Sequence, residues 1–386
     1  MQAKNKIYLD QSSTSFPKAP GVADAMWTLL EHHGVNISRG NYQEAYSVEG
    51  DVLDTRIRLA KLFNVQDPRN IIFTPGVTFS LNTFFEGYLH PGDHVVVSGM
   101  EHNAVMRPLT RLQQRRGVRF TIAEANDRGE VPIEAFEKAL ERDTKAIVTL
   151  HASNVAGTIL PAQAIGQLCK ERDIVFVLDT AQSAGSVEID MEAMNIDLLA
   201  FTGHKGLRGP QGIGGFAITK ELIDSMEPLT VGGTGSRSNS FIQPEFMPDK
   251  YESGTMNIPG IIGLRTALIY LEKQGLSEIH NVKMSLTKRF LDGLSTIKGV
   301  RAVGMPGVEG RTSVVSITAV ERDNAEIAFE LERDWNIMTR VGLHCAPIAH
   351  QSLKTFPQGT VRFSFGATNT EEEIDTALEA LAVLTS

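Results

Sequence analysis

Residues 174–205 read IVFVLDTAQSAGSVEIDMEAMNIDLLAFTGHK. The five apolar residues at 174–178 show no alternation with polar side chains, which is typical of a strand whose two faces are both covered. The run DLLAF at 197–201 repeats this pattern, and polar residues follow each run, among them Asp179 and Lys205. The stretch therefore predicts two buried strands with reactive groups at their carboxyl ends.

The same texture continues on both sides of this stretch. The other short apolar runs are IIF (71–73), HVVV (94–97), VRFTI (118–122), AIVTL (146–150) and GFAI (215–218). Amphipathic segments alternate with them, such as 161–172, which opens with proline, and 51–63, where Leu53, Ile57 and Ala60 are expected to share one face. The alternation predicts an α/β region with a mainly parallel sheet.

After Tyr251 the pattern changes to that of a smaller α+β domain. We expect two helices and then two strands there, at 260–273, 277–297, 312–317 and 361–365. A last helix should begin at Thr370, because Glu373 completes a capping box and an apolar stripe follows at Ile374, Leu378 and Leu381.

The length of 386 residues fits two domains at roughly 100–200 residues each. We predict a large domain at 21–257 and a small domain formed by 1–20 and 258–386.

The formal charge of −9 argues against nucleic acid as a partner. The N-terminus MQAKNKIYLD lacks the apolar stretch of a signal peptide, and no run approaches the roughly 18 apolar residues of a membrane span. We expect a cytoplasmic protein with no membrane partner.

Three kinds of group follow the predicted strands. Gly76 and Thr78 open a helix whose first N–H groups suit a phosphate, and Asp179 and Lys205 supply a carboxylate and an amine. Pyridoxal phosphate (PLP) needs all three, since its aldehyde binds a lysine and its ring nitrogen binds a carboxylate. Taken singly, Lys205 could be a surface lysine, Asp179 a helix N-cap, and Thr78 an ordinary helix residue.

Other motifs fail on their context. Residues 212–217 fit G-x-G-x-x-A, but they lead into a predicted strand instead of leaving one, so a dinucleotide fold is not supported. The phosphate-loop and HExxH patterns are absent. His32 and His33 lie in a helical pattern without metal-ligand spacing, and we assign no metal.

Taken together, the motifs resemble the class V aminotransferase-like PLP enzymes, and among them most closely the cysteine desulfurases. The matching segments run nearly end to end: IYLDQSSTSFPKAP, FTPGVTFSLN, EHNAVM, LDTAQSAG, FTGHKGLRGPQGIGG, YESGTMNIPGIIGL, RVGLHCAP and VRFSFGATNTEEEID. The resemblance implies PLP as cofactor, the fold type I architecture with a seven-stranded sheet in the large domain, and a homodimer.

The resemblance also implies roles for single residues. Lys205 matches the Schiff-base lysine, Asp179 the partner of the pyridine nitrogen, Gln182 a neighbour of the ring hydroxyl, and His102 the histidine that stacks on the ring and shuttles protons. The residues that match the phosphate ligands are Thr78, Thr202 and His204, with Thr255 reaching the phosphate of the neighbouring subunit. Val77 and Asn154 are also assigned to cofactor binding.

Asn154 and Arg362 match the pair that receives the substrate carboxylate, a task that suits a planar guanidinium, and Arg340 is assigned to the same substrate site.

Cys345 decides the expected reaction, because it occupies the position of the nucleophilic cysteine in the second group of desulfurases. The alternative is a buried structural thiol, a reading that fits the other cysteine, Cys169, in its helical pattern. Around Cys345 the residues Gly342, His344 and Pro347 suggest an accessible loop, where His344 or Arg340 could favour the thiolate.

One position departs from the family pattern. Leu343 stands where that group usually has a first histidine, and His350 and Gln351 are the polar residues that could compensate.

The expected function is the conversion of L-cysteine to L-alanine, with the sulfur held on Cys345 as a persulfide and then passed to an acceptor protein or a small thiol. Two alternatives stay open: a selenocysteine lyase or another class V enzyme such as an epimerase or transaminase, and a non-catalytic scaffold that keeps the fold.

Overall fold

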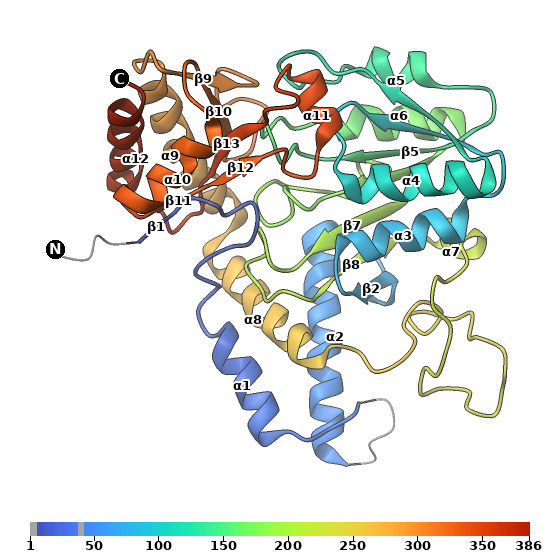
Figure 1. The fold of residues 1–386 in the computed structure, drawn as a ribbon. Coiled ribbons are helices and arrows are strands. Elements are labelled where there is room, and N and C mark those ends of the chain that lie inside the picture. The colour runs from blue at the N-terminus through green and yellow to red at the C-terminus, as the bar shows by residue number, and fades with distance from the viewer. Residues whose placement is uncertain (1–5, 38–41) are drawn as a thin grey trace.

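A seven-stranded sheet forms the centre of the molecule (Figure 1). The structure is a computed structural model and describes residues 6–37 and 42–386. In spatial order the strands are β2 (Ile71–Thr74), β8 (Gly214–Ile218), β7 (Leu198–Thr202), β6 (Val175–Asp179), β5 (Thr144–Leu150), β3 (His94–Ser98) and β4 (Arg119–Ala123). Only β8 runs antiparallel to its neighbours in this sheet. The predicted mainly parallel sheet is confirmed.

Helices cover both faces of this sheet. Side chains alternate along each strand, so Val96 and Phe176 enter one apolar core while Val97 and Val177 enter the other. The helices of the first core are α1 (Val22–His32), α2 (Gln43–Phe63), α5 (Ile133–Ala139), α6 (Ala162–Arg172) and α8 (Ile258–Gln274). Those of the second are α3 (Val77–Tyr88), α4 (Asn103–Arg116) and α7 (Lys220–Ser225). A short 3-10 turn, η1 (Pro68–Asn70), precedes β2.

The buried face of α2 differs from the prediction. Leu53 and Ile57 are 49% and 47% exposed, although Ala60 is buried. The inward face also carries polar residues, because the guanidinium of Arg56 is buried in an ion pair with Glu252. This pair interrupts the apolar stripe, so Leu53 and Ile57, predicted to share one face with Ala60, are not buried with it.

A second, antiparallel sheet is built mainly from the C-terminal part of the chain. Its strands, in order, are β12 (Arg340–Gly342), β13 (Thr360–Ser364), β10 (Val314–Ala319) and β9 (Val300–Val303). Its core includes residues of α9 (Leu276–Leu294), α10 (Asn324–Trp335) and α12 (Glu371–Leu384). The predicted capping box of Thr370 and Glu373 is present at the start of α12.

The N-terminal segment lies against this second sheet. Strand β1 (Ile7–Tyr8) pairs in parallel with β11 (Ile337–Met338), and the short helix α11 (Pro347–Ser352) follows β12. The domain limits given above stay a prediction. Residues 1–5 of the predicted small domain and 38–41 of the predicted large domain lie outside the described residues. Among the described helices none is long and apolar enough to cross a membrane.

The two sheets are joined through the segment that follows β5. Arg311 is 1% exposed and donates to the carbonyl oxygen of Ala156 at 3.1 Å. The hydroxyl of Ser316 donates to the carbonyl oxygen of Val155 at 2.7 Å. Backbone N–H of Thr312 adds a bond to the Gly157 oxygen at 2.8 Å. These bonds fix the backbone directly beside Asn154.

Glu101 supports the turn between β3 and α4. Its carboxyl group is fully buried, accepts from the hydroxyl of Ser98 and from the N–H of Leu150, and leaves Oε2 without a partner among the described residues. Burial raises the pKa of Glu101 to about 8. The side chain is therefore protonated at neutral pH.

We predict that Glu101→Gln weakens the pH dependence of stability. The folded protein keeps the Glu101 proton up to about pH 8, whereas the unfolded chain loses it above about 4.5, so the wild type loses stability as pH rises between these values. Glutamine does not titrate. The free energy of unfolding of Glu101→Gln, relative to that of the wild type, should therefore increase by up to about 1.4 kcal/mol for each pH unit in that window.

Urea unfolding at pH 5, 6, 7 and 8 tests this. The matched control is Glu137→Gln, at an exposed position of α5. If the free energies of unfolding of Glu101→Gln and the wild type change in parallel with pH across this window, Glu101 is not protonated in the folded protein.

Candidate active site

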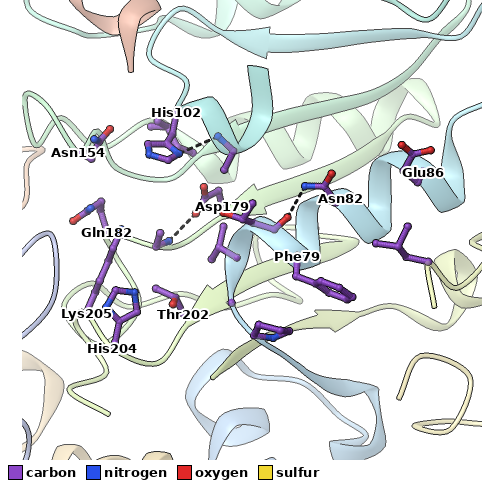
Figure 2. A pocket seen from close by; sticks show the side chains of 18 of the residues that line it. Phe79, Asn82, Glu86, His102, Asn154, Asp179, Gln182, Thr202, His204 and Lys205 are labelled. Atoms are coloured by element: carbon purple, nitrogen blue, oxygen red, sulfur yellow. Dashed lines mark hydrogen bonds between the residues drawn. The ribbon is translucent and has the colours of Figure 1, made fainter. Parts of the chain in front are cut away.

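A cavity of about 820 Å³ opens at the carboxyl ends of β5, β6 and β7, beside the N-termini of α3 and α4. Figure 2 shows Asp179, Gln182, Thr202, His204 and Lys205 gathered on one side of it. The predicted site residues that line the cavity are Val77, Thr78, His102, Asn154, Asp179, Gln182, Thr202, His204 and Lys205. The sheet thus brings together groups that lie far apart in the sequence.

Lys205 follows β7 by three residues and is half-buried. Burial lowers the pKa of its ammonium, Asp179 opposes this, and Arg362 and Arg340 add to it, so that the pKa is lowered to about 8. A substantial fraction of the amine is therefore neutral near pH 8, as attack on an aldehyde requires.

Asp179 ends β6 and is 4% exposed. Its Oδ1 accepts from the N–H of Ala181 at 2.8 Å, and burial raises the pKa of the carboxyl group against the opposing effects of that bond and of Lys205. The residues after it form turns up to the next strand, so Asp179 caps no helix. Gln182 in these turns donates to the carbonyl oxygen of Ser12 at 3.1 Å.

The start of α3 forms an anion cradle. Gly76 precedes the helix at φ 151°, which side chains rarely adopt, and a Cβ there would stand 3.4 Å from the Thr202 hydroxyl. The N–H groups of Val77 and Thr78, in the first turn of α3, have no acceptor one turn earlier in the helix, and together with the helix dipole they favour an anion at this point. His204 Nδ1 lies 3.1 Å from the hydroxyl of Thr14.

His102 is the N-cap of α4. Its Nδ1 accepts from the N–H of Ala104 at 3.0 Å, which assigns the ring proton to Nε2. Burial and then the charge of Lys205 lower the pKa of His102 to about 4. The ring is therefore neutral at physiological pH and able to donate from Nε2.

Arg362 on β13 is 3% exposed, and its guanidinium binds Asp10 at 2.8 Å, Ser13 at 2.7 Å and the carbonyl oxygen of Asn154 at 3.0 Å. Two buried atoms here have no partner among the described residues, Nε of Arg362 and Oδ1 of Asn154. Buried polar atoms without partners are uncommon in native proteins, and these two leave hydrogen-bonding capacity for a ligand.

Cys345 lies on the loop between β12 and α11 and is exposed. Its backbone oxygen accepts from the N–H of Asn103 at 2.7 Å, and the oxygen of His344 accepts from Nδ2 of Asn154 at 2.8 Å. His344 and Cys345 have φ 48° and 58°, a left-handed conformation that is uncommon outside glycine. In contrast, Cys169 is buried in α6, where burial raises the pKa of its thiol.

His344 does not supply the positive charge expected beside the thiol. The ring is 7% exposed, Nε2 contacts the Thr360 hydroxyl at 2.9 Å, and burial lowers the pKa of His344 to about 2. Of the two residues that could favour the thiolate, His344 therefore offers no positive charge at neutral pH, and the role of Arg340 stays a prediction. His350, whose ring centroid lies 5.6 Å from that of His344, is also buried, and its pKa is lowered to about 4.

Four assigned residues lie outside the cavity lining: Cys345 and Arg362, described above, and also Arg340 and Thr255. Arg340 is exposed and donates to the Ser13 hydroxyl at 2.7 Å. Thr255 is exposed on the segment before α8 and does not line this cavity.

The sequence reasoning missed the N-terminal residues of the site. Asp10 and Ser13 bind Arg362, and Thr14, Ser15 and Lys18 bind the carbonyl oxygen of His204. The segment IYLDQSSTSFPKAP was part of the family resemblance, but its run of polar residues carries no spacing typical of a site, so no role was assigned to them.

Comparison with known proteins agrees with this geometry. The family described as Aminotransferase class-V matches residues 7–377. A protein of Pyrococcus abyssi named probable cysteine desulfurase is 32% identical over 383 residues, which cover 98% of this chain and 94% of that one.

Solved structures agree as well. The apo structure of a cysteine desulfurase from Thermococcus onnurineus has a TM-score of 0.92 at 31% identity and covers 98% of this chain and 94% of the other. The cysteine desulfurase CsdA of Escherichia coli, in an S-sulfonic acid form, has a TM-score of 0.89 at 26% identity, with 99% and 96% covered. The predicted fold type I is confirmed. This chain belongs to the class-V aminotransferase family, among the relatives named cysteine desulfurases.

Proposed function

We propose that this protein is a PLP-dependent cysteine desulfurase that converts L-cysteine to L-alanine and holds the sulfur on Cys345. The observation that carries the proposal is the position of the exposed Cys345 loop. It is bonded to Asn103, beside His102, and to Asn154, whose main-chain oxygen binds Arg362. The loop that carries the thiol is thereby anchored to the start of α4 and to Asn154, both at the cavity that Lys205 and Asp179 line.

The residues present fit PLP. The N-terminus of α3 with Thr202 and His204 would hold its phosphate, Asp179 its ring nitrogen, Gln182 its ring hydroxyl, and Lys205 its aldehyde. The glycine at position 76 leaves the helix N-terminus open to such a group. When bound, PLP supplies an electron sink for carbanion chemistry at the substrate Cα.

The protein side chains supply the remaining chemistry. Arg362 binds the substrate carboxylate by donating from Nε, which has no partner among the described residues, with Asn154 beside it; the unpartnered Oδ1 of Asn154 is an acceptor and serves an N–H or O–H donor of the substrate or cofactor. Lys205 takes the Cα proton on Nζ. His102 donates and accepts a proton at Nε2. The Cys345 thiolate attacks the substrate sulfur, so that an S–S bond forms and the C–S bond breaks. The electron pair of the C–S bond stays with the carbon fragment, which takes up protons and leaves as alanine.

The acceptor of this sulfur is then a protein or a small thiol. We also propose a cytoplasmic homodimer. Supporting it, large apolar side chains on three helices stand in solvent, at Trp27, Leu30, Leu53, Ile57 and Ile269. In a dimer of this kind the exposed Thr255 would serve the partner's phosphate site.

Replacing Cys345 separates desulfuration from the other PLP reactions. After incubation with L-cysteine, intact mass should show one added sulfur on the wild type and none on Cys345→Ser, with alanine formation lowered at least 100-fold because the nucleophile is gone. The variant should still bind PLP. Cys169→Ser, which changes the buried thiol, is the matched control and should keep the adduct.

Full-rate turnover of L-cysteine or another amino acid by Cys345→Ser would instead assign a lyase, epimerase or transaminase reaction. A purified protein that stays colourless after added PLP would assign the scaffold alternative.

The rate of PLP uptake by the apoprotein should follow the lowered pKa of Lys205. Only the neutral amine reacts with an aldehyde, so the uptake rate should rise with pH and level off above about pH 8. Stopped-flow absorbance from pH 6.5 to 9.5 measures it, with a free lysine derivative in the same buffers to correct for titration of PLP. A rate that still rises steeply at pH 9.5 would contradict the lowered pKa.

Light scattering after size exclusion should give twice the chain mass. A charge on the exposed apolar side chains of α1 and α2 should disfavour association, so Leu30→Glu with Ile57→Glu should shift the protein to monomer. Val383→Glu, an equally apolar exposed position on α12, is the control and should remain dimeric. A monomeric wild type would refute the homodimer.

A further inference from the structure

Helix α4 carries a row of arginines that the chemistry described above does not use. Arg107, Arg111 and Arg115 recur every four residues and so share one face of the helix. All three are exposed, and none forms an ion pair within residues 6–37 and 42–386. Their neighbour Arg116 is different, because it pairs with Glu86 at 2.8 Å. In a chain of net charge −9 this concentration of free cations is unusual.

The arginine row starts at the nucleophile. Cys345 is bonded through its backbone oxygen to Asn103, the first residue of α4. At a rise of about 1.5 Å per residue, Arg107 follows about 6 Å along the axis, Arg111 about 12 Å and Arg115 about 18 Å. A molecule that reaches the exposed Cys345 sulfur along this helix therefore passes all three guanidinium groups.

The cavity extends in the same direction. Arg111, Arg115 and Arg116 line it together with Lys205 and Asp179, so it continues from the reaction centre along α4. Across it lie Asn82 and Glu86 of α3, which point into the outer part in Figure 2, away from Lys205. Glu86 is already neutralised by Arg116. The outer cavity thus has a surplus of positive charge.

The amino-acid substrate does not need this surplus, because its one carboxylate binds at Arg362. The three arginines instead span about 12 Å, more than one or two adjacent carboxylates can cover, whereas an extended peptide covers that distance with about four residues. Acidic residues along such a peptide would meet the guanidinium groups in turn.

We propose that Arg107, Arg111 and Arg115 form the docking face for the sulfur acceptor, and that this acceptor is a protein segment in which acidic residues flank a cysteine. The inference rests on the proposed function. In the transfer step the acceptor thiolate attacks the outer sulfur of the Cys345 persulfide. A new S–S bond forms, the old S–S bond breaks with its electron pair on the Cys345 sulfur, and the proton of the persulfide stays on the transferred sulfur, with no net oxidation.

The test uses the PLP-loaded enzyme and three ten-residue peptides that hold one cysteine each, flanked by acidic, neutral or basic residues. The enzyme is charged with L-cysteine, freed of it by desalting, and mixed with each peptide; mass spectrometry follows the added sulfur. The acidic peptide should react fastest, and Arg107→Gln/Arg111→Gln/Arg115→Gln should lower its kcat/KM about tenfold, while transfer to uncharged dithiothreitol stays unchanged.

The matched control is Arg142→Gln/Arg172→Gln/Arg301→Gln, which removes three exposed arginines elsewhere and should keep the wild-type preference. Raising the salt from 0.05 to 0.5 M should diminish the preference in the wild type and leave the α4 variant unaffected. Equal rates for the acidic and basic peptides, or an undiminished preference in the α4 variant, would overturn the proposal.

Two further outcomes also overturn it. Glutathione, a small thiol with two carboxylates, should not show the arginine dependence; if it does, a small anionic thiol is the acceptor. A changed oligomeric mass of the α4 variant would assign the row to contact between copies of the chain.

Docking is measured independently of sulfur chemistry by fluorescence anisotropy with the acidic peptide in its Cys→Ser form. If no adduct forms on Cys345 before a peptide is added, the desulfurase function fails, and the anisotropy still decides whether the row binds acidic segments.

Discussion

A single buried guanidinium connects the parts of this protein that form its reaction centre. Arg362 belongs to the second sheet, but its partners are Asp10 and Ser13 near the start of the chain and the backbone after β5 of the central sheet. A buried cation is tolerated only when it is paired and hydrogen-bonded, so Asp10 is required for this arrangement. The clamp orients the arginine before a substrate arrives and fixes Asn154 beside it.

Burial adjusts the charges around this clamp in opposite directions. It lowers the pKa of Lys205 and raises that of Asp179, and together with the charges of nearby cations it lowers the pKa of His102, which stays neutral. Each side chain sits where a strand or helix ends, so its depth in the protein is set by the backbone. The reactive state of the site therefore follows from the sheet that carries it.

Local patterns predicted the parts of the structure that depend on local physics. The unbroken apolar runs identified the strands, and the capping box located the start of α12, since both signals act over a few residues. The face of α2 escaped prediction because Arg56 finds its partner, Glu252, far along the chain.

The same limit applies to the candidate site. The residues after the strands were found, as the sheet must gather them at one edge. Asp10 and Ser13 were missed because they meet Arg362 from the opposite end of the sequence, and the charge of His344 was misjudged because residue type does not reveal burial.

The unequal exposure of the two thiols makes the chain a convenient object for spectroscopy. Because Cys169 is buried in α6 and Cys345 is exposed to solvent, a maleimide dye reacts with Cys345 alone without any engineering of the sequence. Its emission would follow the movements of the nucleophile loop in real time.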